Sequence, residues 1–168
     1  MCSYCGCDSI DLIGRFMDEH VEIINSRGQL RRAVEAGDAE LVRERVTHLA
    51  GLLGPHTGAE EVGLFAVMKR QDEFTDYIAT LCGEHTTLDE LLVRIAAGEH
   101  ELYEPFELAL RAHIDKEDNS LFPAAAVSLA GADWTDADAL THDHDHLVGT
   151  AHHHRAVTRE PSHLSPHT

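Results

Sequence analysis

Residues 42–67 read VRERVTHLAGLLGPHTGAEEVGLFAV and carry an apolar stripe that two polar side chains interrupt. The stripe recurs every three or four residues, which is the spacing of one face of an α-helix. Its members are Val42, Val46, Leu49, Leu53, His56, Glu60, Leu64 and Val67. Asp38 is a suitable N-cap for this helix, whereas Pro55 should kink or locally break it just before His56. The segment therefore predicts an amphipathic helix whose inward face includes a histidine and a carboxylate.

Three further segments have the same helical period, one before this stretch and two after it. With it, they give expected helices over about residues 9–37, 38–67, 72–98 and 102–124. Pro123 should bend or end the last of these helices. Because the connecting loops are short, neighbouring helices should run antiparallel. The sequence therefore predicts an all-α fold, an up-down-up-down four-helix bundle that occupies residues 9–130, with a His-rich C-terminal extension.

The two end segments differ from the bundle in composition. Residues 1–8 contain three cysteines, Cys2, Cys5 and Cys7. Their thiolates are soft metal ligands, so this segment is either a redox-active or metal-accepting motif or an oxidisable end. Residues 131–168 are rich in His and Asp, can start a fifth helix near Asp133, and have a composition typical of disorder beyond about Arg159. This tail is either a weak metal-binding segment or a solvated acidic one.

The charge and the hydropathy pattern exclude several classes of protein. The chain has 13 Lys+Arg against 30 Asp+Glu, which gives a formal net charge of −17. Contacts with nucleic acid or anionic membranes need basic patches, so neither partner is expected. No stretch reaches the ~18 to 20 apolar residues of a membrane span, and the N-terminus lacks the basic and apolar regions of a signal peptide. The four cysteines form no disulfide framework, so we expect a cytoplasmic protein.

Histidine is unusually frequent in this sequence, with 14 residues among 168. Eight lie between positions 142 and 167, and His48 and His100 fall off the main stripes, which predicts surface positions for them. The remaining four interrupt the inward stripes near mid-helix, one in each expected helix. They are His20, His56, His85 and His113. All four can therefore meet at one level of an antiparallel bundle.

Two glutamates accompany these histidines on the inward faces. Glu60 follows His56 by one turn and Glu117 follows His113 by one turn, and residues at i and i+4 share a helix face. Burying this many unpaired ionisable groups would be very costly, and a metal removes the cost because it binds neutral imidazoles and carboxylates. The sequence therefore predicts a metal centre inside the bundle.

Six candidate ligands suit two metal ions better than one. A single structural zinc takes four ligands, so a four-helix protein with one zinc site and a structural role is the plainer alternative. Mixed imidazole and carboxylate ligands suit iron or manganese. Ferritin-like centres use Glu-x-x-His pairs, whereas the pairs in this chain are His-x-x-x-Glu.

Four spaced elements together resemble the hemerythrin-like (HHE cation-binding) family over roughly residues 9–127. They are Asp18-Glu19-His20, then residues 56–65 (HTGAEEVGLF), then Glu84-His85, then residues 113–117 (HIDKE) with Leu121-Phe122-Pro123. The resemblance implies an up-down bundle that holds two non-haem iron ions. It also implies that Glu60, Glu117 and a solvent-derived oxo or hydroxo group bridge the irons. The terminal ligands would then be His20, His56, His85 and His113.

One position departs from the oxygen carriers of this family. They have His-x-x-x-His on the third helix, and here the second position is Asp89. A lost imidazole opens a coordination position, which suits reaction with peroxide, O2 or nitric oxide. An added carboxylate would instead stabilise ferric iron, and a third reading makes Asp89 a solvated surface residue. Glu61 or Asp118 could replace Glu60 or Glu117 as a bridge, although the i+4 spacing favours the latter two.

The sequence thus predicts a protein that binds or reacts with O2, peroxide or nitric oxide at a bridged iron pair. The alternative is an iron-binding, storage or sensing protein, or an iron–sulfur repair protein, that delivers iron with no turnover of its own. Some hemerythrin-like proteins implicated in such repair carry N-terminal cysteines, which this chain also has. The sequence does not choose between these two functions. It also does not say whether the protein is a catalyst or which partner exchanges electrons with it.

Overall fold

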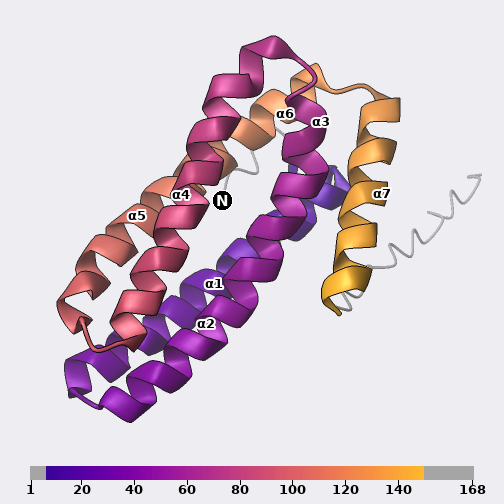
Figure 1. Cartoon of the computed structure of the whole chain (residues 1–168). Helices are drawn as coiled ribbons and strands as arrows, with labels where there is room; N and C mark the ends of the chain where they lie inside the picture. Colours follow the sequence, from indigo (N-terminus) through magenta and orange to yellow (C-terminus); the bar gives the residue numbers. More distant parts are fainter. Residues whose placement is uncertain (1–6, 150–168) are drawn as a thin grey trace, which may run out of the picture.

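The computed structural model describes residues 7–149, and helices account for nearly all of them. Four long helices form a bundle in which consecutive helices run in opposite directions (Figure 1). They are α1 (Asp11–Ala36), α2 (Ala39–Glu60), α4 (Asp72–Ala96) and α5 (Tyr103–Lys116). Contacts join α1 to α2, α2 to α4, α4 to α5 and α5 to α1, so the four helices close a ring of neighbours. The all-α fold predicted from the sequence is confirmed for the described residues.

The ends of α1 and α2 follow from local chemistry. Gly37 adopts a left-handed conformation (φ 68°) after α1, and its N–H bonds the carbonyls of Ala33 and Val34. The side chain of Asp38 then accepts hydrogen bonds from the backbone N–H groups of Glu40 and Leu41, at 3.1 and 3.0 Å. The cap at Asp38 is the one that the sequence predicted.

Pro55 does not break α2, which runs unbroken from Ala39 to Glu60. A proline inside a helix costs about 3 kcal/mol because it removes one hydrogen bond and crowds the preceding turn. Contacts of α2 with α1, with α4 and with a further helix, α7 (Gly131–Val148), hold the helical geometry against that cost. The Thr57 hydroxyl also donates to the Gly54 carbonyl at 3.2 Å, within the turn that contains the proline. The expected local break is therefore wrong.

Two five-residue π-helical segments, which the sequence reasoning missed, follow α2 and α5. They are η2 (Glu61–Phe65) and η4 (Glu117–Leu121), and the chain continues from them as α3 (Ala66–Met68) and α6 (Phe122–Ser128). Pro123 lies in the first turn of α6, where a missing N–H costs least, so it does not end the helix. Single π turns are rare and often mark functional positions. Both lie beside a candidate ligand.

The core consists of two apolar clusters with a polar layer between them. On α1, α2 and α4 the candidate histidine separates one cluster from the other, and the same change of cluster occurs from α5 to η4, close to His113. The flanking pairs are Met17 and Ile23 around His20, Ala59 and Leu53 around His56, Leu81 and Leu88 around His85, and Leu121 and Leu110 around His113. The four histidines therefore lie at one level of the bundle, as their similar depths in the sequence predicted.

A fifth long helix, α7 (Gly131–Val148), lies beside the bundle and packs against α2, η2 and α3 (Figure 1). It occupies the range in which the sequence permits a helix starting near Asp133. Within residues 7–149, no helix is both long enough and apolar enough to cross a membrane. The expected disorder beyond Arg159 and the thiols of Cys2 and Cys5 fall outside the described residues.

Candidate metal centre

Six buried side chains converge at the middle of the bundle, and they are the six that the sequence analysis identifies as candidate ligands. His20 comes from α1, His56 and Glu60 from α2, His85 from α4, His113 from α5 and Glu117 from the start of η4. They form two groups, each with four ligand atoms within 4.8 Å of one another. One group is His20, His56, Glu60 and Glu117, and the other is Glu60, His85, His113 and Glu117. Because the groups share both glutamates, they define two adjacent positions for a cation.

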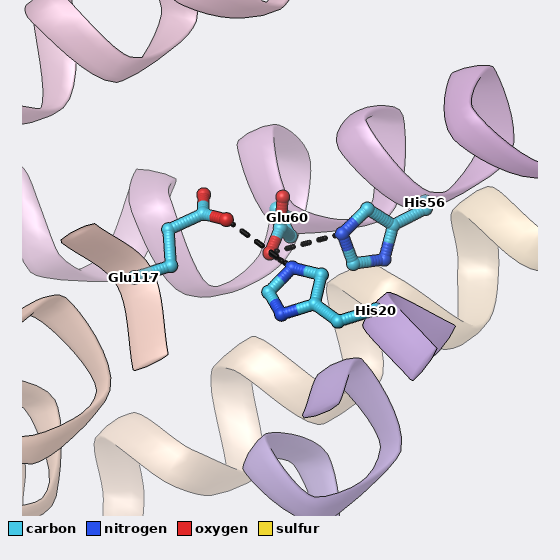
Figure 2. Close-up of side chains that lie close together, drawn as sticks. All are labelled: His20, His56, Glu60 and Glu117. Atoms are coloured by element: carbon cyan, nitrogen blue, oxygen red, sulfur yellow. Dashed lines mark ion pairs between the residues drawn. The ribbon is translucent and has the colours of Figure 1, made fainter. Parts of the chain in front are cut away.

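Each shared glutamate directs one carboxylate oxygen toward each group. Glu60 Oε1 lies 3.5 Å from Nε2 of His56 and 3.9 Å from Nε2 of His20, whereas Glu60 Oε2 lies 3.5 Å from Nε2 of His85. Glu117 Oε2 lies 3.2 Å from Nε2 of His20, and Glu117 Oε1 lies 3.2 Å from Nε2 of His113. Figure 2 shows the side chains of the first group pointing toward one another. A carboxylate oriented in this way can bridge two cations.

A second carboxylate holds each of the four histidines at Nδ1. The pairs are Glu19 with His56 at 2.7 Å, Glu61 with His85 at 2.8 Å, Glu84 with His113 at 3.0 Å and Asp118 with His20 at 2.9 Å. Each pair joins two neighbouring helical segments, so the four pairs close a circuit around the bundle. A ring whose Nδ1–H donates to a carboxylate keeps its lone pair at Nε2, and such partners orient histidines in metal sites. All four Nε2 atoms therefore face the centre, where their lone pairs can bind a cation.

The sequence reasoning assigned no role to Glu19 and Glu84. It offered Glu61 and Asp118 as alternative bridges, while favouring positions behind the ligands or on the surface for both. The structure places all four on Nδ1 atoms, and none belongs to either group of candidate ligands. Each is directly beside a candidate ligand in the sequence, which is the signal that was available. Each reaches a histidine on a neighbouring helix, however, so the pairing depends on the packing of the helices.

The six side chains fit a metal pair because several of their polar atoms are otherwise unsatisfied. Both carboxylate oxygens of Glu60 and of Glu117, together with Nε2 of His20, are buried without a hydrogen-bond partner. The Nε2 atoms of His85 and His113 face each other at 2.9 Å, so two neutral rings would direct their lone pairs at each other. Each unsatisfied buried polar group typically costs about 1–3 kcal/mol. Two cations among these atoms would remove the penalties.

The protonation of the centre reflects its excess of carboxylates. Burial and the charge of Glu117 raise the pKa of Glu60 well above its usual value. Burial acts on Glu117 in the same direction, but the imidazoles of His113, His20 and His85, whose Nε2 atoms lie 3.2, 3.2 and 3.8 Å from its oxygens, outweigh it and hold the pKa of Glu117 well below normal. Burial lowers the pKa of His20, whereas the hydrogen bond to Asp118 and the charge of Glu117 raise it, with a net value of about 9. Protons must leave Glu60 and His20 before they bind a cation.

Aromatic rings cover the histidines on their apolar sides. Phe65 stacks on His85 with 5.7 Å between ring centroids, and Phe122 stacks on His20 at 5.8 Å. Phe16 meets His56 edge-on at 5.7 Å. All three phenylalanines are fully buried. These rings exclude water from that side of the centre and lower the local dielectric, which strengthens the electrostatic contacts inside it.

A cleft of about 640 Å³ between α2 and α4 reaches one of the candidate ligands, His85. Its lining includes His85 together with Glu61, Asp89, Glu90 and Arg94. Asp89 thus lines the route to His85 and is a member of neither group of candidate ligands. Three carboxylates against one guanidinium make the entrance acidic, which favours neutral molecules or cations over anions.

The N-terminal cysteines are partly described. Cys7 is buried in the apolar cluster next to the start of α1 and is disulfide-bonded, so it offers no free thiolate. The alternatives for residues 1–8, a redox-active or metal-accepting motif or an oxidisable end, stay predictions, and the disulfide at Cys7 is compatible with a redox-active or an oxidised end. Cys82 on α4 is a free thiol, partly buried, and burial raises its pKa.

Comparison with protein-family models shows which family the chain resembles. The model of the family described as "Hemerythrin HHE cation binding domain" matches residues 11–125, which span the whole bundle and both groups of candidate ligands. No match was found among curated proteins or among solved structures. Helix α7 lies beyond the matched range.

Proposed function

The chain belongs to the hemerythrin HHE cation-binding family, and on that premise we propose that it is a non-haem di-iron protein that binds or reacts with O2, peroxide or nitric oxide. One observation carries the proposal. The two groups of four candidate ligands share Glu60 and Glu117, and each glutamate directs one oxygen to each group. A single structural zinc would need only one such group. We take the bridge between the irons to be an oxo or hydroxo group together with these carboxylates.

Bound iron would supply open coordination positions and electrons for the small molecule. The protein's part is to hold the pair and control what reaches it. The four Nδ1 carboxylates fix the histidine rings with Nε2 toward the centre, so little reorganisation is needed on binding. The stacked rings of Phe65 and Phe122 keep water from one side. These features favour a reactive centre over a site that only stabilises the fold.

The acidic cleft between α2 and α4 supports the choice of ligand class. It leads from solvent to His85 and is lined by Glu61, Asp89 and Glu90. Neutral O2, hydrogen peroxide and nitric oxide can pass an acidic entrance without electrostatic cost, and Fe²⁺ would be attracted to it. Asp89 stands where the oxygen carriers of the family have a histidine, so one imidazole fewer surrounds the pair. This supports reaction at an open position over simple reversible carriage of O2.

Metal content and the visible spectrum test the proposal. Protein expressed in iron-rich medium should hold about two irons per chain, one for each group. Its spectrum should change on oxidation, on reduction and on addition of peroxide or nitric oxide. His56→Ala and His113→Ala should each lower the iron content, because each removes a ligand from a different group. His48→Ala is the matched control, since His48 is an exposed histidine on the same helix as His56.

Two results would contradict the proposal. One is a folded protein that stays free of iron in iron-rich medium or binds a single zinc ion. The other is a protein with two irons whose spectrum responds to none of the three small molecules, which would instead support the storage or delivery reading.

A further inference from the structure

Helix α7 lies outside the range of the family match and packs directly on the part of the bundle that carries Glu60. Two glycines allow the close approach. A Cβ atom at Gly58 would lie 2.6 Å from Nε2 of His144, and one at Gly63 would lie 2.0 Å from Oγ1 of Thr141. Both distances are shorter than any real Cβ contact. The α2 and η2 surface is therefore shaped to receive α7.

The first polar link from α7 goes to the backbone next to Glu60. The Thr141 hydroxyl donates to the carbonyl of Ala59 at 3.4 Å, and Thr141 is fully buried. The other shared glutamate, Glu117, has an equivalent contact beside it. There the Tyr77 hydroxyl of α4 donates to the carbonyl of Lys116, the residue before Glu117, at 3.3 Å. At both shared glutamates, a hydroxyl group thus binds the backbone carbonyl of the preceding residue.

The second polar link from α7 reaches His56 through two side chains of α1. Asp145 binds the Arg15 guanidinium through both of its oxygens, at 2.6 and 2.9 Å. Arg15 Nε donates to Glu19 Oε1 at 2.7 Å, and the other oxygen of Glu19 accepts from Nδ1 of His56 at 2.7 Å. The four side chains that form this path, from Asp145 to His56, are all at least largely buried. In the other group of candidate ligands, Lys116 binds Glu84, the partner of His113, without help from α7.

These two links act on different parts of the centre. Carboxylates within the bundle hold the Nδ1 atoms of His20, His85 and His113 without help from α7. The Nδ1 partner of His56 is supported from α7 through Arg15 and Asp145, and the backbone next to the shared Glu60 is supported from α7 through Thr141. We propose that α7 is part of the metal centre. In this proposal Asp145 is a positioning residue for His56 and the metal that it holds with His20, and Thr141 is a positioning residue for Glu60, which faces both metals. The inference rests on the proposed function, because it needs bound metals to position.

The fixed orientation of His56 and Glu60 is what α7 would supply. Two parallel N–H···O bonds between an arginine and a carboxylate constrain both groups strongly. Arg15 held in this way keeps Glu19 on His56, and outer hydrogen-bond partners of this kind typically change metal affinity about 10- to 100-fold. Loss of the Asp145 link should therefore weaken the metal position of His56 and spare the other, whereas loss of the Thr141 link should weaken both positions, because both share Glu60.

The rate of iron loss to a chelator tests the inference on the full chain. Asp145→Asn should release one of the two irons about tenfold faster than the parent protein, with the second iron released at the parent rate. Thr141→Val should release both irons faster than the parent protein, because it acts on the shared Glu60. Thr141→Ser keeps the hydroxyl and should restore the parent behaviour. The matched controls are Asp143→Asn and Thr135→Val, at exposed positions of the same helix. Helix content and thermal midpoint, measured on the same samples, show whether a variant still folds.

The outcomes separate the two proposals. A parent protein without metal overturns the proposed function and this inference together. A parent with two irons and variants that lose both irons at the parent rate overturns the inference alone. An Asp145→Asn variant that loses both irons equally fast, with a lower thermal midpoint, also overturns it, because α7 would then support only the fold.

Discussion

Glu84 on α4 accepts a hydrogen bond from Nδ1 of His113 on α5, with 3.0 Å between the two atoms. The contact ties two helices together and fixes the direction of the Nε2 lone pair of His113. Its equivalents at the other three histidines make the centre a closed network of carboxylates and imidazoles, with Glu60 and Glu117 inside it.

Replacing Glu84 by glutamine tests the role of this network. The amide keeps the shape of the side chain but weakens the acceptor of the His113 Nδ1–H, and it also loses the ion pair with Lys116. We expect the affinity for metal to fall about 10- to 100-fold while the helix content is unchanged. Glu90→Gln, an exposed position of the same helix, is the control. Equal affinities in the two variants, measured by competition with a chelator, would contradict the prediction.

Asp89→Asn should leave both metal ions in place. Asp89 lines the cleft and is not among the ligand atoms that converge on either position. Metal analysis of the purified variant checks this expectation. A loss of one metal would instead show that Asp89 is a ligand, which is the reading that the sequence left open.

Glu60→Gln should weaken metal binding and stabilise the metal-free protein. The pKa of Glu60 is raised well above 4.5 because it is buried next to Glu117. The folded metal-free protein therefore loses stability as the pH rises above about 4.5, where the unfolded chain ionises freely. At pH 8 the variant should have the higher free energy of unfolding, by about 1–3 kcal/mol, with the difference shrinking toward pH 4.5. Urea unfolding at several pH values measures it, and Glu44→Gln on the exposed face of α2 should show no such trend.

Gly63→Ala should disturb the contact with α7, whereas Gly51→Ala should not. A Cβ atom at Gly63 would lie 2.0 Å from the Thr141 hydroxyl, while nothing lies within 4 Å of one at Gly51. In an exposed helix position, alanine is more stable than glycine by about 0.5–1 kcal/mol. Gly51→Ala should therefore raise the thermal midpoint and Gly63→Ala should lower it. An increase in both variants would mean that α7 moves away at little cost.

Tyr103→Phe should remove an alkaline transition at the end of the bundle far from the metal centre. Burial, with a smaller effect of Glu107, raises the pKa of Tyr103 from 10 to about 12. The neutral phenol is thus favoured in the folded state, so its stabilisation is complete below pH 10 and is lost as the pH rises from 10 to about 12. The free energy of unfolding of the phenylalanine variant should change less over this range. Parallel slopes for variant and parent would contradict the assignment.

The sequence by itself determined the helices and the identity of the six converging side chains. Helical periodicity is local, and a histidine or glutamate on an apolar stripe must point inward whichever helices surround it. His20, His56, His85 and His113 could therefore be placed at one level from their depths along the helices. The caps at Gly37 and Asp38 were equally local, since each depends on a few adjacent backbone groups.

Only the tertiary structure decided how the carboxylates divide their roles. Glu60 and Glu61 are adjacent in the sequence, yet the first faces both metal positions and the second holds His85 from behind. The π turns that begin at Glu61 and Glu117 have no local sequence signal, and Pro55 stays helical because neighbouring helices hold it. The path from Asp145 to His56 joins three helices. Such contacts depend on the distances and angles between helices, which periodicity along one chain does not contain.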